Sequence, residues 1–139
     1  MRSTRDERDA RAHFDERYRV KGNAAAAAVE QTVIGAVWGA NGYTTVAQAD
    51  ELARRLRVGP GSRLLDVGTG RGWPGLYLAR QTGCSVVGTD MPVEGLVHAE
   101  QRALRERIEG RVSLVAAAGA AQPLRSSSFD AVVLTDVLC

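Results

Sequence analysis

The hydrophobic pattern of the chain changes between two periods, one typical of strands and one typical of helices. Short runs rich in apolar residues occur at Leu64–Val67, in the segment that ends at Asp90, at Val112–Val115 and at Phe129–Leu134. Helical patterns separate these runs, except before the last one, where 116–128 is a loop rich in Ala, Gly, Ser and Pro. Because strands that alternate with helices form parallel sheets, the pattern predicts an α/β fold with a parallel sheet.

Two helices are predicted ahead of the first strand. Asn23 is a suitable cap for the first, which glycines at 39–42 should end. Its expected packing face consists of Val29, Val33, Ile34, Val37 and Trp38. The second begins at Thr45, which matches a capping box with Gln48, and runs to about Arg57. We expect both helices to pack beside the sheet.

A further helix is predicted after Asp90, because Pro92 suits a first helical turn and Gly110 a stop. Its buried face should consist of Leu96, Ala99, Ala103 and Leu104. The pattern divides the chain into a charged arm at 1–22, two capping helices at 23–58 and a sheet-forming part at 59–139. The arm is predicted to be a surface helix, with an interaction arm as the alternative.

Length and composition narrow the class of protein. With 139 residues the chain is one domain at most, and a net charge of +2 gives no reason to expect nucleic acid or an anionic membrane as a partner. The longest apolar tract is interrupted by polar residues at 30–32, so no membrane segment is predicted. Cys84 and Cys139 lie far apart, which indicates neither a disulfide nor a zinc site, and no other metal-ligand spacing is evident. A cytoplasmic protein without a metal is therefore expected.

The candidate chemistry lies where the first strand ends. Glycines stand at every second position, Gly68, Gly70 and Gly72, so the backbone can turn tightly and a ligand can approach it. Asp66 places a carboxylate beside this turn, suited to an ammonium group. Asp90 ends the second strand, where it can accept hydrogen bonds from both hydroxyls of a ribose. S-adenosylmethionine has an amino-acid cation, a ribose and an adenine, and so fits these features.

These residues resemble a known family. DVGTGRG (66–72) is similar to the first motif of class I S-adenosylmethionine-dependent methyltransferases, GTD (88–90) to their second, and FDAVVLTDVL (129–138) to their fourth strand and the residues after it. TGRGWPGLYLA (69–79) further resembles a bacterial group of small-molecule methyltransferases. The resemblance implies a Rossmann-like sheet, S-adenosylmethionine as cofactor and a small-molecule methyl acceptor.

The resemblance also implies roles for particular residues. Gly68 and Gly70 would contact the methionine part of the cofactor through their backbones, within a loop that also contains Thr69 and Gly72. Asp66 would orient the amino group of the cofactor, and Asp90 would bind the ribose.

Adenine contacts are implied for the residues that follow the second and third strands. Met91 would pack on the adenine ring. Where the family usually has an acidic residue that accepts from the adenine amino group, this chain has Ala118, and Gly119 can still offer a backbone N–H. Trp73, inside the glycine loop, has two equal interpretations: it lines the cofactor pocket or it belongs to the core.

A dinucleotide site is the main alternative, since Gly70, Gly72 and Gly75 spell GxGxxG and Asp90 follows at the expected distance. A pyrophosphate needs free N–H groups at the helix start, and Pro74 removes one of them. Asp66 would also bring a carboxylate near the phosphates. The methyltransferase interpretation is therefore favoured over NAD binding.

Asp136, just past the fourth strand, is the candidate general base on the reaction side. The family sheet has seven strands in the order 3, 2, 1, 4, 5, 7, 6, and this chain supplies strands one to four. An apolar fourth strand at the sheet edge invites self-association or another partner. We therefore expect a truncated methyltransferase whose activity needs testing, with a non-catalytic cofactor-binding module completed by a partner as the alternative.

Overall fold

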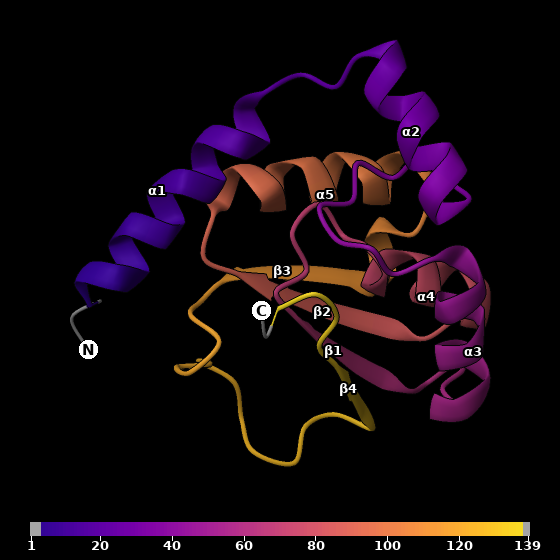
Figure 1. Cartoon of the computed structure of the whole chain (residues 1–139). Helices are drawn as coiled ribbons and strands as arrows, with labels where there is room; N and C mark the ends of the chain where they lie inside the picture. Colours follow the sequence, from indigo (N-terminus) through magenta and orange to yellow (C-terminus); the bar gives the residue numbers. More distant parts are fainter. Residues whose placement is uncertain (1–3, 138–139) are drawn as a thin grey trace.

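The computed structural model describes residues 4–137, and its centre is a parallel sheet of four strands in the order β3-β2-β1-β4. The strands are β1 (Arg63–Val67), β2 (Ser85–Asp90), β3 (Val112–Ala116) and β4 (Ala131–Val133). The predicted α/β class, the parallel direction and the order 3-2-1-4 are confirmed (Figure 1). β4 is shorter than the predicted strand over 129–134. At its start the Asp130 N–H donates to the Arg63 carbonyl, but the Arg63 N–H donates to the Asp130 carboxylate and not to a backbone carbonyl.

The register of the sheet brings the candidate chemistry to one edge. Asp66 lies opposite Gly88 of β2 and Val133 of β4, while Asp90 lies opposite Ala116 of β3. All four strands therefore end at the same side of the sheet, as in other open parallel sheets.

Helices α4 (Gly75–Thr82) and α5 (Val93–Arg105) connect the strands and cover one face of the sheet. The core between them includes Leu64, Leu76, Leu78 and Val86, which are fully buried. In Figure 1 the segment after β3 runs along the opposite side of the sheet.

The predicted bounds of α5 were partly wrong. The helix begins at Val93, with Pro92 in the capping position, and it ends at Arg105 before a 3-10 turn, η1 (Glu109–Arg111), which contains Gly110. Leu104 was predicted to be buried but is exposed, because it lies beyond the row formed by Leu96, Ala99 and Ala103 that meets the sheet.

Helix α3 (Val46–Leu56) confirms its prediction, with the capping box between Thr45 and Gln48 present and Arg57 as its carboxyl-terminal cap. It packs against α4, where the Tyr77 hydroxyl donates to Asp50.

Helix α2 (Ala24–Ile34) is capped by Asn23 as predicted, but it ends earlier than the pattern indicated. Gly35 stops it with φ of 90°, and the Glu30 carboxylate accepts the backbone N–H groups of Trp38 and Ala40 to hold the following turn. The predicted packing face is therefore wrong: only Ile34 and Trp38 of that set are buried. The three other members, Val29, Val33 and Val37, are exposed.

The charged arm forms helix α1 (Arg5–Arg19), which begins with a capping box between Thr4 and Glu7. The predicted surface helix is confirmed, with one exception: Tyr18 is buried, at the end where α1 packs on α5 (Figure 1). Within residues 4–137 no helix has the length and apolar character needed to cross a membrane. Cys84 is buried with a free thiol, and Cys139 lies outside the described residues.

Candidate functional site

The glycine-rich loop leaves β1 and wraps around the end of β2. The backbone N–H groups of Gly68 and Thr69 both donate to the Thr89 carbonyl, at 2.7 and 3.0 Å. Gly68, Gly70 and Gly72 have φ of 75°, 54° and 95°, a region that favours glycine. The predicted tight turn is confirmed, and it holds the loop backbone at the carboxyl edge of the sheet.

Asp66 is the buried anchor of this loop, with 1% of its surface exposed. Its Oδ2 accepts hydrogen bonds from the Thr69 hydroxyl at 2.7 Å and from the Gly75 N–H at 3.1 Å. Burial, with a smaller contribution from the nearby charge of Asp90, raises the pKa of Asp66 to about 7, although these two hydrogen bonds lower it. Oδ1 is buried and has no hydrogen-bond partner among the described residues, so it can accept from an ammonium group.

The same contacts argue against a pyrophosphate. The first N–H of α4, which a dinucleotide phosphate would use, already donates to the Asp66 carboxylate. A phosphate there would meet a buried acidic group. This geometry disfavours the dinucleotide alternative on grounds that are independent of Pro74.

Asp90 lies on the other side of the loop, at the end of β2. Its Oδ2 accepts the Gly70 N–H at 2.7 Å and its Oδ1 accepts the Met91 N–H at 2.8 Å. Burial raises the pKa of Asp90, while these two hydrogen bonds lower it. Each carboxylate oxygen keeps a further lone pair, so the group can still accept from the two hydroxyls of a ribose.

The loop after β3 lies beside these strand ends. The Ala117 N–H donates to the Asp90 carbonyl at 2.9 Å, and a Cβ at Gly119 would lie 3.8 Å from Val67. The structure thus brings Ala118 and Gly119 to the edge that the sequence predicted for the adenine.

Gln122 was missed by the sequence analysis. Its Nε2 donates to the Ala118 carbonyl at 3.0 Å, and its Oε1 is buried without a partner among the described residues. It is an acceptor close to the position where the family usually has an acidic side chain. One feature of the sequence could have identified Gln122: it is an uncharged polar residue in a loop that is otherwise rich in alanine.

Trp73 is buried in an aromatic cluster behind the loop. Its ring centroid lies 5.5 Å from that of Trp38 and 5.1 Å from that of Tyr77, and its Nε1 donates to the Thr44 carbonyl at 2.9 Å. These contacts support the core interpretation of both tryptophans. A contact between Trp73 and a ligand stays a prediction.

Asp136 connects two distant segments. Its Oδ2 accepts from the Tyr43 N–H, the Thr44 N–H and the Thr44 hydroxyl, at 3.1, 3.2 and 2.8 Å. A Cβ at Gly42 would lie 2.1 Å from the same oxygen, so the two segments are closely fitted. Through these contacts Asp136 connects the segment after β4 to the segment before α3. Its role as a base stays a prediction.

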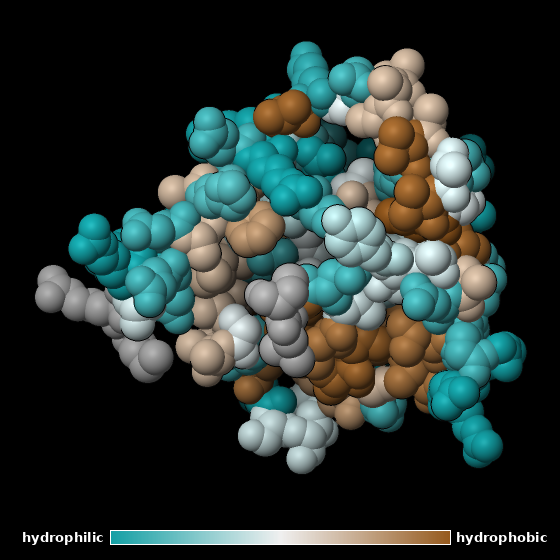
Figure 2. Space-filling view, in the orientation of Figure 1, coloured by the Kyte–Doolittle hydropathy of each residue, from teal (hydrophilic) through white to brown (hydrophobic). Residues whose placement is uncertain are grey.

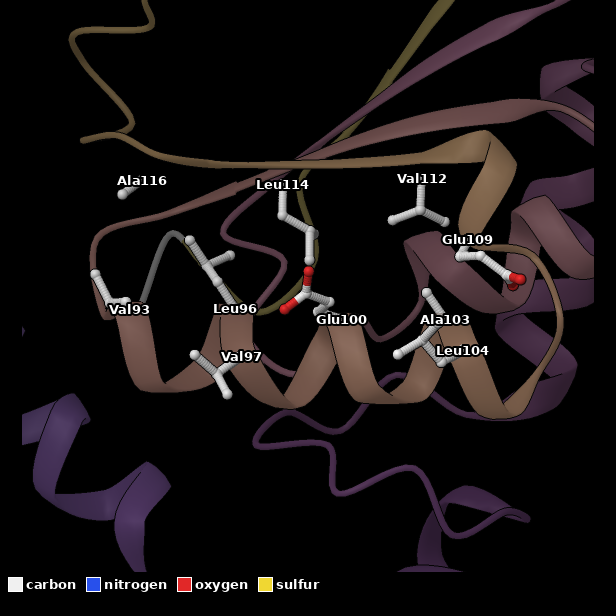
Figure 3. Close-up of a pocket in the computed structure, with 10 residues that line it drawn as sticks. All are labelled: Val93, Leu96, Val97, Glu100, Ala103, Leu104, Glu109, Val112, Leu114 and Ala116. Carbon is white, nitrogen blue, oxygen red and sulfur yellow. The ribbon is translucent and has the colours of Figure 1, made fainter.

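A separate hollow of about 410 Å³ lies between α5 and β3 (Figure 3). Val112 and Leu114 point into it from β3, opposite Leu96 and Ala103 on α5. The Glu100 side chain stands between these two helix residues and points toward Leu114. It lies on the helix-covered face at the β3 end of the sheet, and the glycine-rich loop contributes no residue to its lining.

Comparison with known proteins agrees with this geometry. The family described as "Methyltransferase domain" matches residues 64–139, which contain the loop and both carboxylates. The methyltransferase GfsG of Streptomyces halstedii is 40% identical over 81 residues, covering 58% of this chain and 29% of GfsG. The chain spans less than a third of the length of the curated relatives it matches.

Two solved structures illustrate the similarity in fold. A methyltransferase from Thiobacillus denitrificans, in complex with S-adenosylhomocysteine, has a TM-score of 0.57 at 27% identity, covering 65% of this chain and 36% of that one. Geranyl diphosphate C-methyltransferase from Streptomyces coelicolor has a TM-score of 0.71 at 21% identity, covering 96% of this chain and 55% of that one. At this identity the second likeness concerns the fold alone, and it extends over the N-terminal helices.

Proposed function

This chain belongs to the methyltransferase domain family, as its sequence motifs predicted, and we propose that it binds S-adenosylmethionine at the glycine-rich loop for methyl transfer to a small molecule. The observation that carries the proposal is the pair of carboxylates on either side of the loop, the fully buried Asp66 and the half-buried Asp90. Asp66 has a buried acceptor atom for an ammonium group, and Asp90 has lone pairs for a ribose diol.

Each part of the cofactor has a counterpart in the chain. Asp66 Oδ1 would accept from the amino group, and the backbones of Gly68 and Gly70 would border the methionine part. Asp90 would accept from the ribose hydroxyls. Met91 and Gly119 would border the adenine, with Gln122 Oε1 as an acceptor that replaces the side chain absent at Ala118.

S-adenosylmethionine supplies a methyl group that its sulfonium already activates. The protein therefore has to hold the donor, align the acceptor atom with the methyl group and exclude water. A base is needed only where the acceptor must lose a proton, and Asp136 is the candidate for that step.

The acceptor is proposed to be a small molecule. The net charge of +2 gives no reason to expect nucleic acid as the acceptor. The two widely separated cysteines support a cytoplasmic setting. A cofactor-binding module that a partner completes is the second candidate, because β4 pairs only with β1 among the described strands.

Calorimetric titration with S-adenosylhomocysteine tests the proposal. The full chain should bind it, and Asp90→Ala should weaken binding at least tenfold by removing acceptors for the ribose. Asp9→Ala, at an exposed position on α1, is the matched control and should leave affinity unchanged. Absence of binding to the unchanged chain, or tighter binding of NAD, would contradict the proposal.

A further inference from the structure

Strand β3 forms one edge of the sheet, since it pairs with β2 and with no other strand within residues 4–137. Neighbouring residues of a strand direct their backbone N–H and C=O groups to opposite sides, so alternate residues of β3 direct theirs away from the sheet. Apart from the ladder with β2, no backbone hydrogen bond within residues 4–137 involves 113–116. This edge therefore offers backbone donors and acceptors to a further strand.

The hollow of about 410 Å³ between α5 and β3 runs beside this edge (Figure 3). Three alternate residues of β3 face the same side of the sheet and line the hollow: Val112, Leu114 and Ala116. Across from them α5 contributes three apolar side chains that are exposed: Val93, Val97 and Leu104. A strand added to the β3 edge would direct every second side chain toward the hollow, where apolar side chains would be buried.

Two carboxylates give the hollow a preference for positive charge. The Glu100 side chain points toward Leu114, the middle residue of β3, and Glu109 lies at the Val112 end. Neither carboxylate forms an ion pair with another residue of 4–137, and none of the ten lining residues is basic. A basic side chain at the middle of an added strand would therefore meet Glu100.

A second copy of the chain fits this edge less well. Two β3 strands that pair antiparallel about a two-fold axis would place both α5 helices on one face, with Glu100 and Glu109 of each copy along the shared hollow. These carboxylates would gather there without a basic partner, which opposes the pairing. A partner that brings its own positive charge avoids this repulsion.

We propose that the β3 edge and the hollow together bind an extended peptide segment of a protein partner, whose side chains on the α5 side are apolar, basic and apolar in turn. Backbone hydrogen bonds to β3 supply affinity, and the hollow with Glu100 selects the side chains. The glycine-rich loop contributes no residue to this surface, so the inference goes beyond the proposed function and does not depend on it.

The end-blocked peptide SVTKTVS is a suitable probe, because its two valines flank the lysine at alternate positions. Titrated into the isotope-labelled full chain, it should shift the backbone amide signals of β3 and α5 in nuclear magnetic resonance spectra. Glu100→Lys should weaken this binding about tenfold, because two positive charges would then meet. The same variant should bind SVTETVS more tightly than the unchanged chain does. Asp9→Lys makes the same change of charge at an exposed position on α1, and as the matched control it should alter neither affinity.

Two further ligands distinguish an added strand from other occupants. SVTKTVS with N-methylated peptide bonds keeps its side chains but loses its backbone donors, so it should lose most of its affinity. n-Octylamine has an apolar chain and a cation but no peptide backbone, and it should bind more weakly than SVTKTVS.

Four results would overturn the proposal. SVTKTVS could leave the signals of β3 and α5 unshifted, or Glu100→Lys could act no differently from Asp9→Lys. N-methylation could leave the affinity unchanged, which would exclude strand addition. Finally, n-octylamine could bind as tightly as the peptide, which would make the hollow a site for small amphiphilic cations.

Discussion

Asp66 and Asp90 lie at the carboxyl ends of neighbouring parallel strands, one residue before the end of β1 and at the end of β2, and together they hold the two ends of one loop. Asp90 Oδ2 accepts the Gly70 N–H at 2.7 Å, and Asp66 Oδ2 accepts the Gly75 N–H at 3.1 Å. The Asp66 carboxyl group is fully buried and that of Asp90 is half-buried, and the charge of Asp90 contributes to the raised pKa of Asp66. The loop is therefore held by two acidic groups whose charge a cationic ligand would offset.

Ligand affinity should depend on pH through Asp66. Its pKa is raised to about 7, so the group is largely protonated below that pH, and an ammonium group favours the ionised form. Affinity for S-adenosylhomocysteine should rise about tenfold between roughly pH 6 and pH 8. Calorimetry at several pH values would measure this rise, and Asp66→Asn should flatten the profile. An unchanged slope in that variant would show that another group titrates.

Stability of the free chain should follow the opposite trend. Because the folded-state pKa of Asp66 is raised from 3.8 to about 7, the folded protein binds more protons than the unfolded chain within that window. The contribution of Asp66 to the free energy of unfolding is fully present below about pH 4 and is lost as pH rises through about 7. Urea unfolding across this range should show the decline, and Asp66→Asn should remove it. A variant that declines as steeply as the unchanged chain would contradict this assignment.

Gly70→Ala should destabilise the protein and weaken ligand binding. Gly70 has φ of 54°, and the new Cβ would lie 2.6 Å from the Tyr18 hydroxyl. We expect a loss of about 1–3 kcal/mol in urea unfolding. Gly110→Ala is the control, since a Cβ there meets nothing within 4 Å. Adding Tyr18→Phe to Gly70→Ala should recover part of the loss, and no recovery would mean that backbone strain is the whole cause.

Substitution of Asp136 should separate a structural role from a catalytic one. Asp136→Ala removes the acceptor of three hydrogen bonds from Tyr43 and Thr44, and should cost about 1 kcal/mol in urea unfolding. Asp136→Asn keeps an acceptor oxygen and tolerates the φ of 56°, so it should be nearly as stable as the unchanged chain. Binding and methyl transfer would be measured for both variants. A stable Asp136→Asn chain that binds cofactor but loses turnover would support the predicted base.

Self-association through β4 remains a prediction that sedimentation can test. β4 pairs only with β1 among the described strands, and Val132 and Leu134 are 49% and 48% exposed. Figure 2 shows apolar surface in the region where β4 lies. Val132→Lys should reduce association, because a charged side chain on an edge strand opposes pairing with another chain. Val29→Lys, at an exposed position on α2, is the control, and equal effects of the two substitutions would point away from β4.

The sequence alone determined those features of this protein that depend on residues close together in the chain. The turn at Gly68 and Gly70, the cap at Thr45 and the placing of Asp66 and Asp90 at strand ends all follow from residues within a few positions of each other. Parallel strands end at one edge of the sheet, so the predicted ligand-binding edge followed from the same local pattern.

Only the tertiary structure decided the features that depend on segments far apart in the chain. Hydrophobic spacing predicts that a helix has an apolar face but not whether another element covers it, which is why Val29 was wrongly expected to be buried and Tyr18 was overlooked. Likewise the Asp136 carboxylate accepts hydrogen bonds from a segment that lies more than 90 positions away in the sequence. A side chain's neighbours are set by the packing of the whole chain, so the contact of Tyr18 with Gly70 and Gly95 became visible only when α1, the loop and α5 were brought together.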